Sequence, residues 1–224
     1  MKQMQVWKAG IVKRLTGGVR SLVKGSGTEY VQARAEFIGK KAVKLHYADG
    51  KPSDIVEAEH IVIATGSKPI QIPGFEVDGK RVLDSRAMLD LDAVPENLVC
   101  IGGGIIGLEL GQTFQRLGSK LVVLEGADRI LGACEPDTAN VVAKQIVRDG
   151  GEVHTKAFAK SWEERDGKAY VKAEIDGAIK EFPADIILLA VCRRPVTQGF
   201  AIEKTGVKVN DRGFIDVDAR LQTN

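Results

Sequence analysis

Three closely spaced glycines are the residues of this chain that most clearly indicate a binding function. Gly102, Gly104 and Gly107 form the pattern G-x-G-x-x-G within LVCIGGGIIGLE. An apolar run that predicts a strand precedes the pattern, and a run with helical spacing follows it. In such a turn the first glycine allows a sharp bend, the second lets a pyrophosphate approach the backbone, and the third lets the helix pack on the strand. The pattern favours dinucleotide binding over a purely structural turn.

A carboxylate at the end of the next predicted strand strengthens this interpretation. Glu125 follows the glycines by about 20 residues, where a dinucleotide-binding fold places an acid on the ribose hydroxyls. The same carboxylate would repel a 2′-phosphate by about 1 kcal/mol in water and about 4 kcal/mol at an effective dielectric of 20. Only Arg129 lies near it in sequence to offset this repulsion, so NAD is favoured over NADP. The alternative for Glu125 is a solvated acid at a strand end.

The segments around the glycines alternate between strand and helix patterns. Strands are predicted at 97–101, 120–125 and 185–191, helices at 105–118 and 136–151, and short alternating strands at 152–158, 168–175 and 178–184. This order predicts the α/β class, with a Rossmann-like three-layer domain that contains an inserted β-meander.

The first part of the chain has a different pattern. We predict a helix and turn over 1–27, strands at 29–37 and 42–47 that form a hairpin, and a buried strand at HIVIATG, 60–66. The segment 67–97 contains several prolines and is interpreted as a linker that crosses between two domains.

Composition argues against several functional classes. The formal net charge is +2, with 44% hydrophobic and 28% charged residues, which favours neither nucleic acid nor an anionic membrane as a partner. No apolar run approaches the roughly 20 residues that span a bilayer. Cys100, Cys134 and Cys192 lie far apart, as expected for free thiols in a reducing compartment, and the three histidines form no metal-site pattern. We therefore expect a cytoplasmic protein without a metal.

Longer motifs resemble a known family. The stretches ATGSKPIQIPG, VCIGGGIIGLELGQTFQRLGSKLVVLEGADRIL, LLAVCRRPVT and GFIDVDARLQTN are similar to the flavin-dependent pyridine nucleotide–disulfide oxidoreductases, in particular the dihydrolipoamide dehydrogenase type. Mercuric reductases and soluble transhydrogenases share much of this pattern. The resemblance implies a partial FAD-binding domain at 1–68, a linker at 69–97, an NAD-binding domain at 98–194, and a return to the FAD-binding domain at 195–224.

The resemblance also implies roles in an NAD site. Glu109 would contact the nicotinamide end, unless it is only a carboxylate on the helix surface. Ile105 would cover the flavin until nicotinamide displaces it, with simple packing as the alternative, and the backbone at Ala159 would meet the adenine. Cys192 replaces the glycine of the usual GRxP motif near the nicotinamide, where its side chain would crowd the cofactor unless it is a small buried hydrophobe. The implied NAD-contacting set is Gly102, Gly103, Gly104, Ile105, Ile106, Gly107, Glu109, Glu125, Ala159 and Cys192.

A second implied set concerns FAD. By resemblance, the strand pair at Arg34 and Ala35 would read the flavin's adenine through its backbone, and Thr65, Gly66 and Ser67 would contact FAD. The alternative for the latter three is a strand that ends in a glycine turn. Ala33 stands where relatives commonly have glycine, a mild change if its φ is negative.

The family reaction passes electrons from dihydrolipoamide to a cysteine disulfide, then to FAD, then as hydride to NAD⁺. This sequence contains no close cysteine pair, no second glycine fingerprint, and no interface domain with a catalytic histidine and glutamate, and it ends before a further aspartate contact to the flavin. We expect a fragment that binds NAD(H) without catalytic residues of its own. Its parent would be a homodimer that acts on a lipoyl-bearing protein or a small disulfide. The alternatives are a non-catalytic NAD-sensing module and, less favoured, a methyltransferase, in which the ATGS strand, linker and meander would have no role.

Overall fold

The computed structural model describes all residues, 1–224. The chain forms two compact units. The first comprises Met1–Ala9 and Pro69–Cys192, and the second comprises Gly10–Lys68 and Arg193–Asn224.

A five-stranded parallel sheet is the centre of the first unit. The strand that precedes the glycines lies in the middle of this sheet, and all neighbouring strands run parallel to one another. The predicted strand–helix–strand order around the glycines is confirmed. In spatial order the strands are β5 (Val82–Leu83), β12 (Ile186–Leu189), β6 (Asn97–Ile101), β7 (Lys120–Leu124) and β8 (Glu152–His154).

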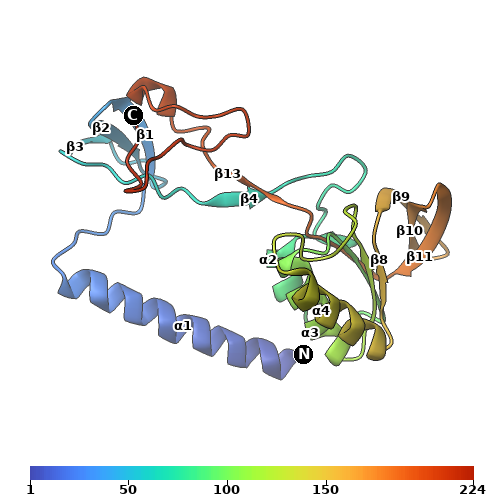
Figure 1. The fold of residues 1–224 in the computed structure, drawn as a ribbon. Coiled ribbons are helices and arrows are strands. Elements are labelled where there is room, and N and C mark those ends of the chain that lie inside the picture. The colour runs from blue at the N-terminus through green and yellow to red at the C-terminus, as the bar shows by residue number, and fades with distance from the viewer. The chain divides into compact units, whose positions relative to one another are not determined.

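Helices cover one face of this sheet and a β-meander covers the other (Figure 1). The helices are α2 (Ser85–Leu89), α3 (Ile105–Arg116) and α4 (Pro136–Arg148), and the antiparallel meander consists of β9 (Ala157–Arg165), β10 (Lys168–Ile175) and β11 (Ala178–Ala184). Apolar side chains of the central strands alternate between the two cores, with Val99 toward the meander and Leu98 toward the helices. The predicted three-layer α/β architecture is confirmed.

The end of α3 and the position of β8 each have a clear structural cause. α3 ends before Gly118, whose φ of +114° is a conformation that favours glycine. The sequence pattern assigns residues 152–158 to the meander, but residues 152–154 form β8, the edge strand of the parallel sheet. There the backbone N–H of Glu125 donates to the carbonyl of His154 at 2.8 Å. Pairing with the neighbouring buried strand therefore decides where these residues lie.

The expected crossover segment contributes to the core of the first unit. It supplies β5 and α2, and Phe75, Val82 and Met88 are completely buried. The α2 helix begins at Asp84, whose carboxylate accepts the N–H of Ala87 at 2.8 Å, an ordinary N-terminal cap.

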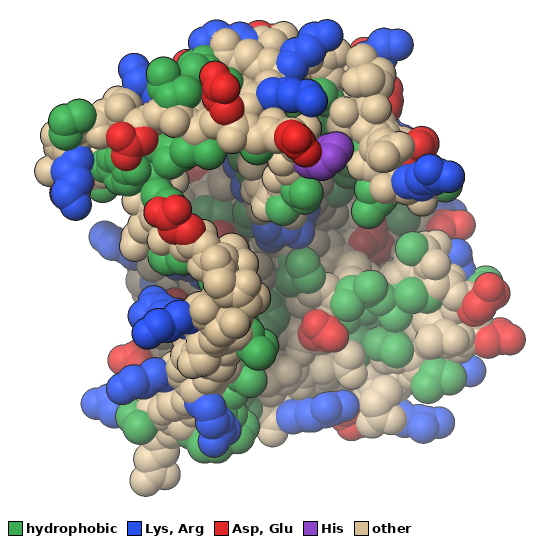
Figure 2. All heavy atoms as spheres, turned by 90° about the vertical axis from the view of Figure 1, so that its left-hand side faces the viewer, with side chains coloured by type: hydrophobic (Ala, Val, Ile, Leu, Met, Phe, Trp, Pro, Cys, Tyr) green, Lys and Arg blue, Asp and Glu red, His purple; other side chains and the backbone are tan.

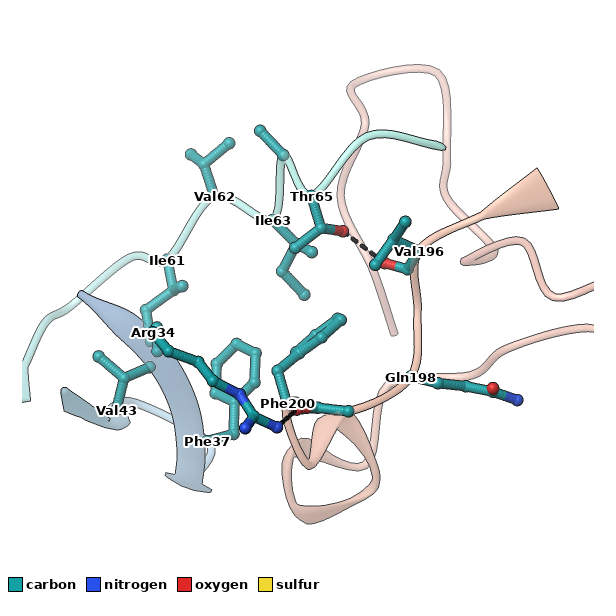
Figure 3. Close-up of a pocket in the computed structure, with 13 residues that line it drawn as sticks. Arg34, Phe37, Val43, Ile61, Val62, Ile63, Thr65, Val196, Gln198 and Phe200 are labelled. Carbon is teal, nitrogen blue, oxygen red and sulfur yellow. Dashed lines mark hydrogen bonds between the residues drawn. The ribbon is translucent and has the colours of Figure 1, made fainter. Parts of the chain in front are cut away.

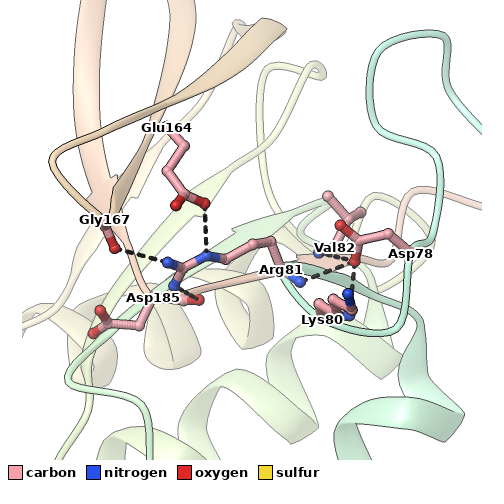
Figure 4. Close-up of polar contacts among 7 residues, drawn as sticks. All are labelled: Asp78, Lys80, Arg81, Val82, Glu164, Gly167 and Asp185. Atoms are coloured by element: carbon pink, nitrogen blue, oxygen red, sulfur yellow. Dashed lines mark hydrogen bonds and ion pairs between the residues drawn. The ribbon is translucent and has the colours of Figure 1, made fainter.

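Arg81 joins this segment to the meander and to the start of β12 (Figure 4). Its guanidinium donates to the carbonyls of Gly167 at 2.7 Å and Asp185 at 3.2 Å, and it pairs with Glu164 at 3.3 Å. Nearby, partial burial raises the pKa of Asp78, but hydrogen bonds from three backbone N–H groups outweigh burial and hold that pKa below its ordinary value. The donors are Lys80, Arg81 and Val82.

The second unit contains two small sheets. β1 (Arg34–Gly39), β2 (Ala42–His46) and β3 (Asp54–Glu57) form an antiparallel sheet, β4 (Ser67–Pro69) pairs with β13 (Arg193–Pro195), and η1 (Ile202–Thr205) is a short 3₁₀ helix. The predicted hairpin is confirmed, but its first strand begins at Arg34 rather than Glu29 because the ladder ends at the Arg34–His46 pair. Phe37 and Phe200 pack with ring centroids 6.0 Å apart.

The prediction of a buried strand at 60–66 is wrong. Residues 61–66 form no strand, and Val62 is 88% exposed. The backbone of 61–64 makes no hydrogen bond. A strand is buried only when neighbouring strands flank it, and none of the strands of this unit pairs with the segment.

The predicted N-terminal helix is confirmed as α1 (Lys2–Gly25), which has no buried residue. Its first turns, up to Ala9, belong to the first unit, within which Gln5 donates to the carbonyl of Leu91 at 2.6 Å and Lys8 pairs with Asp90 at 2.8 Å. In Figure 2, Lys and Arg side chains and hydrophobic side chains lie along this exposed helix at lower left. None of the helices combines the length and apolarity needed to cross a bilayer.

Candidate nucleotide-binding site

The glycine turn lies where the chain order of the parallel sheet reverses. From β6 the chain continues through α3 to β7 on one side, whereas β12 lies on the other side. The N–H of Ala190 donates to the carbonyl of Ile101 at 2.8 Å, which holds the ends of β12 and β6 together. In open α/β sheets, ligands bind outside the carboxyl ends of the strands at such a point.

The first and third glycines are required by the protein's own atoms. Gly102 has a φ of +108°, and a Cβ there would lie 2.6 Å from the carbonyl oxygen of Ala190. A Cβ on Gly107 would overlap the carbonyl oxygen of Gly102 and lie 2.8 Å from Sγ of Cys100. These two positions therefore shape the turn and the contact between helix and strand.

The second glycine of the pattern is different. Gly104 has φ −81° and ψ 177°, a conformation open to any residue, and no atom lies within 4 Å of where its Cβ would be. Neither the backbone conformation nor the packing of this chain requires glycine at this position. Because Gly104 has no side chain, the space beside its backbone is open.

This open space adjoins the start of α3. Gly104 is the N-cap residue and supplies no capping side chain, and the first turn carries no acidic residue. The first N–H groups of a helix lack partners within the helix, and its N-terminus carries a partial positive charge. A bare backbone beside an uncapped helix start is an arrangement that fits the pyrophosphate of a dinucleotide.

Glu125 lies against the same turn. One carboxylate oxygen accepts the N–H of Gly103 at 2.6 Å, and the other accepts the N–H of Ala127 at 2.8 Å. A carboxylate has about four acceptor positions, so the two backbone bonds leave capacity for two hydroxyl donors. Both bonds hold the half-buried side chain in one orientation at the edge of the glycine turn.

A loop that sequence reasoning missed closes one side of the turn. The N–H of Leu131 donates to the carbonyl of Gly103 at 2.8 Å, and Ile130 is buried against it. A Cβ on Gly103 would lie 2.6 Å from Cγ2 of Ile130, so this middle glycine is also required sterically. In the sequence these two residues are only an apolar pair after an acidic turn, which carries no signal of this contact.

The other sequence-predicted residues of this set lie on three elements. Ile105, Ile106 and Glu109 are exposed on α3. Ala159 is half-buried on β9, the strand whose first residue donates its N–H to the carbonyl of Glu125 at 2.9 Å. Cys192 is exposed just after β12, so the alternative interpretation of this residue as a small buried hydrophobe is wrong.

Cys100 is not a redox thiol in this fold. It is completely buried, and burial, with the Glu125 carboxylate as a second cause, raises the pKa of its thiol to about 12. The thiolate needed for disulfide chemistry is therefore absent at neutral pH. No group of His, Cys, Asp and Glu side chains is arranged to hold a metal ion.

A second candidate site lies within the second unit, where a cavity of about 460 Å³ opens beside β1 (Figure 3). Among the residues predicted to contact FAD, Arg34, Ala35 and Thr65 line it. Arg34 donates to the carbonyl of Gly199 at 2.7 Å, and the Thr65 hydroxyl donates to the carbonyl of Val196 at 2.6 Å. These bonds connect the early and late segments of the unit around the cavity.

Two predicted residues lie outside the lining of this cavity. Gly66 accepts the N–H of Val196 at 3.0 Å through its carbonyl, and the Ser67 hydroxyl accepts from Nε of Arg193 at 2.8 Å. The lining is mainly apolar and includes residues that the sequence did not single out: Phe37, Val43, Ile61, Ile63, Val196 and Phe200. Such walls fit a flat aromatic ring, with Arg34 as the charged group beside it.

Comparison with known proteins gives matches along the whole chain. A family model described as pyridine nucleotide-disulphide oxidoreductase matches residues 2–224. The dihydrolipoyl dehydrogenase of Haloferax volcanii is 44% identical over 226 residues, which are 100% of this chain and 48% of that protein. That of Geobacillus stearothermophilus is 40% identical over 222 residues, which are 99% of this chain and 47% of that protein. The chain thus spans about half the length of the curated relatives it matches.

Solved structures are also similar to this chain over most of its length. LpdA from Mycobacterium tuberculosis matches with a TM-score of 0.84 and 25% identity, over 93% of this chain and 46% of that one. A Cu(II) complex of a mutant of the HOCl-induced flavoprotein disulfide reductase RclA from Escherichia coli matches with a TM-score of 0.84 and 28% identity, over 96% of this chain and 48% of that one.

Proposed function

Because this chain belongs to the pyridine nucleotide-disulphide oxidoreductase family, we propose that it is the NAD(H)-binding part of a flavin-dependent oxidoreductase of the dihydrolipoyl dehydrogenase type. The reaction of the whole protein would be oxidation of dihydrolipoamide to lipoamide with reduction of NAD⁺. The observation that carries the nucleotide assignment is the open space at Gly104 beside the uncapped start of α3.

In this proposal the NAD pyrophosphate rests against Gly104 and accepts hydrogen bonds from the first N–H groups of α3, at Ile105 and Ile106. The Glu125 carboxylate accepts the two ribose hydroxyls with the lone pairs that Gly103 and Ala127 leave available. Its negative charge disfavours a 2′-phosphate, which makes NAD rather than NADP the ligand.

The remaining NAD contacts extend from this centre. The backbone at Ala159 meets the adenine, because β9 begins against Glu125. Glu109 and Ile105, both exposed on α3, face the nicotinamide end. Cys192 is exposed after β12, at the position where family members have glycine, and its side chain narrows the space for the nicotinamide.

The cavity beside β1 supports a site for the adenine part of FAD, with Arg34 and Ala35 at one wall and Thr65 at the other. Gly66 and Ser67 follow Thr65 and would contact the flavin farther along. When bound, FAD would supply the two-electron chemistry between a disulfide and the nicotinamide. The proposed domains are 1–68 and 195–224 for FAD, 98–194 for NAD, and 69–97 as the crossover.

We expect this chain by itself to bind the nucleotide without turnover, since its cysteines form no disulfide and Cys100 is buried. The whole protein would work as a homodimer on a lipoyl-bearing protein or a small disulfide. Detectable lipoamide reduction by the purified chain would contradict the expected lack of turnover.

Titration calorimetry with NADH and NADPH tests the nucleotide assignment. Repulsion of about 1 to 4 kcal/mol between Glu125 and a 2′-phosphate predicts that NADPH binds roughly 5-fold to nearly 1,000-fold more weakly than NADH. Glu125→Gln removes the negative charge and is expected to reduce the difference in affinity between NADH and NADPH. Equal affinities of the unmodified chain for the two nucleotides would refute the role of Glu125.

A further inference from the structure

The loop that precedes α4 is connected to the Glu125 carboxylate through a single residue of the glycine turn. This loop, residues 126–135, follows Glu125 and leads to the first residue of α4. The N–H of Leu131 in the loop donates to the carbonyl of Gly103 at 2.8 Å. The N–H of the same glycine donates to Oε2 of Glu125 at 2.6 Å. Gly103 therefore transmits the position of the loop to the carboxylate.

The side chain of Ile130 restricts the position of Gly103. Ile130 is only 2% exposed, and its Cγ2 atom lies 2.6 Å from where a Cβ of Gly103 would be. Oε2 of Glu125 lies 3.1 Å from the same point. The methyl group of Ile130 and the carboxylate of Glu125 thus bound the same small space beside Gly103. Because packing is this close, Gly103 cannot move toward the loop while the methyl group is present.

The backbone of the loop is unfavourable at the residue that bonds to Gly103. Leu131 has a φ of +50°, a left-handed conformation that costs free energy for a residue with a side chain. Such a conformation persists only where the surrounding structure holds it, and it is found most often at functional sites. Here the carbonyl of Leu131 accepts the N–H of Cys134 at 2.8 Å, while its N–H makes the bond to Gly103.

The loop also withholds its only cation. Arg129 is the one basic residue among residues 126–135. Its Nη2 donates to the carbonyl of Gly132 at 2.7 Å, and its Nη1 is buried without a hydrogen-bond partner. The guanidinium is therefore turned into the loop. An arginine that points outward at this edge of the fold accommodates the 2′-phosphate of NADP, whereas this loop supports a carboxylate.

We propose that the loop 126–135 positions the Glu125 carboxylate for the adenosine ribose, with Ile130 as the positioning residue that acts through Gly103. Ile130 would not touch the nucleotide. Without its methyl group Gly103 would move, its N–H would no longer fix the carboxylate, and Glu125 would adopt other rotamers. Hydrogen bonds to the ribose hydroxyls and repulsion of a 2′-phosphate would then both weaken. The inference rests on the proposed function and extends nucleotide selectivity from Glu125 to this loop.

Two substitutions of Ile130 separate positioning from packing. Ile130→Leu conserves volume, which buried sites tolerate well, but it removes the methyl group from Cβ. Ile130→Val is smaller and keeps that methyl group beside Gly103. In calorimetric titrations Ile130→Leu should bind NADH at least fivefold more weakly and show a smaller preference for NADH over NADPH. Ile130→Val should retain both quantities within twofold.

The matched control is Ile146→Leu. Ile146 is completely buried in the same apolar core as Ile130, but it lies on α4. The same exchange of side chains there should leave the NADH affinity and the preference for NADH unchanged. Equal losses in this control and in both Ile130 variants would overturn the proposal, because they would indicate a general loss of packing.

The amide proton of Gly103 gives a second readout, which does not depend on a nucleotide. A charge-assisted hydrogen bond of 2.6 Å should shift its NMR resonance downfield. Ile130→Leu should move this resonance upfield, whereas Ile130→Val and Ile146→Leu should leave it in place. An unmoved resonance in Ile130→Leu, or NADH binding and selectivity equal to those of the unmodified chain, would overturn the role of Ile130.

Failure of the proposed function would give a different result. In that case the unmodified chain would bind no NADH, and the ribose would be excluded as the target of Glu125. The Gly103 resonance of the same variants would still decide whether Ile130 orients the carboxylate. NADH binding that is selective in the unmodified chain and equally selective in Ile130→Leu would instead defeat only the positioning role.

Discussion

Replacing Gly104 by alanine separates nucleotide binding from folding. An added Cβ would meet no atom of the protein within 4 Å, and the backbone angles of −81° and 177° suit alanine. Alanine is a poorer N-cap than glycine by roughly 0.5–1 kcal/mol. It also restricts the unfolded chain, which stabilises by about 0.4–1 kcal/mol. These effects oppose each other, so the free energy of unfolding should change by less than about 1 kcal/mol.

The nucleotide should respond strongly to the same change. The new methyl group would occupy the place where the pyrophosphate approaches the start of α3, and one charge-assisted hydrogen bond is worth about 1.5–3 kcal/mol. Its loss corresponds to a decrease in NADH affinity of roughly 10-fold to 150-fold.

Calorimetric NADH titration and urea unfolding measure the two quantities. Gly17→Ala, which also places a Cβ in open space, is the control and should leave NADH affinity unchanged. Unaltered NADH binding by Gly104→Ala would refute the reasoning. A loss of stability larger than about 2 kcal/mol would show instead that the space is not open.

Further changes test the surroundings of the site. Gly107→Ala should destabilise the chain by about 1–3 kcal/mol in urea unfolding, because its Cβ would overlap a backbone carbonyl of the turn; unchanged stability would contradict this packing. Cys100, with a thiol pKa raised to about 12 by burial, should resist iodoacetamide in the native chain at pH 8 and react in urea; mass spectrometry that finds it alkylated in the native chain would disprove its burial. Hydrogen bonds from Lys204 and then His46 hold the pKa of Glu36 below its ordinary value of 4.5. A depressed folded-state pKa stabilises the folded chain above the unfolded pKa, and that contribution is lost as pH falls through the folded value. Because Lys204→Gln removes the main cause of this shift, it should raise the Glu36 pKa in an NMR titration. An unchanged Glu36 pKa in that variant would contradict the Lys204–Glu36 interaction.

Local patterns in the sequence were enough to predict the strand–helix–strand unit around the glycines. The strand before Gly102, the helix after Gly104 and the stop at Gly118 each depend on periodicity or backbone conformation within a few residues. The three-layer α/β class follows from the order of these elements, and the structure confirms it. Glu125 was singled out by its distance from the glycines along the chain.

Tertiary structure alone decided what each of these residues faces. The glycines look equivalent in the sequence, yet Gly102 and Gly107 are crowded while Gly104 borders open space, because the atoms that crowd the turn come from β6 and the end of β12. The segment 60–66 has the composition of a buried strand, yet none of its residues is buried and only Ile61 and Ile63 are half-buried, since burial depends on neighbouring strands that no local pattern encodes. The contact of Ile130 with Gly103 likewise joins residues whose proximity arises only when the chain folds.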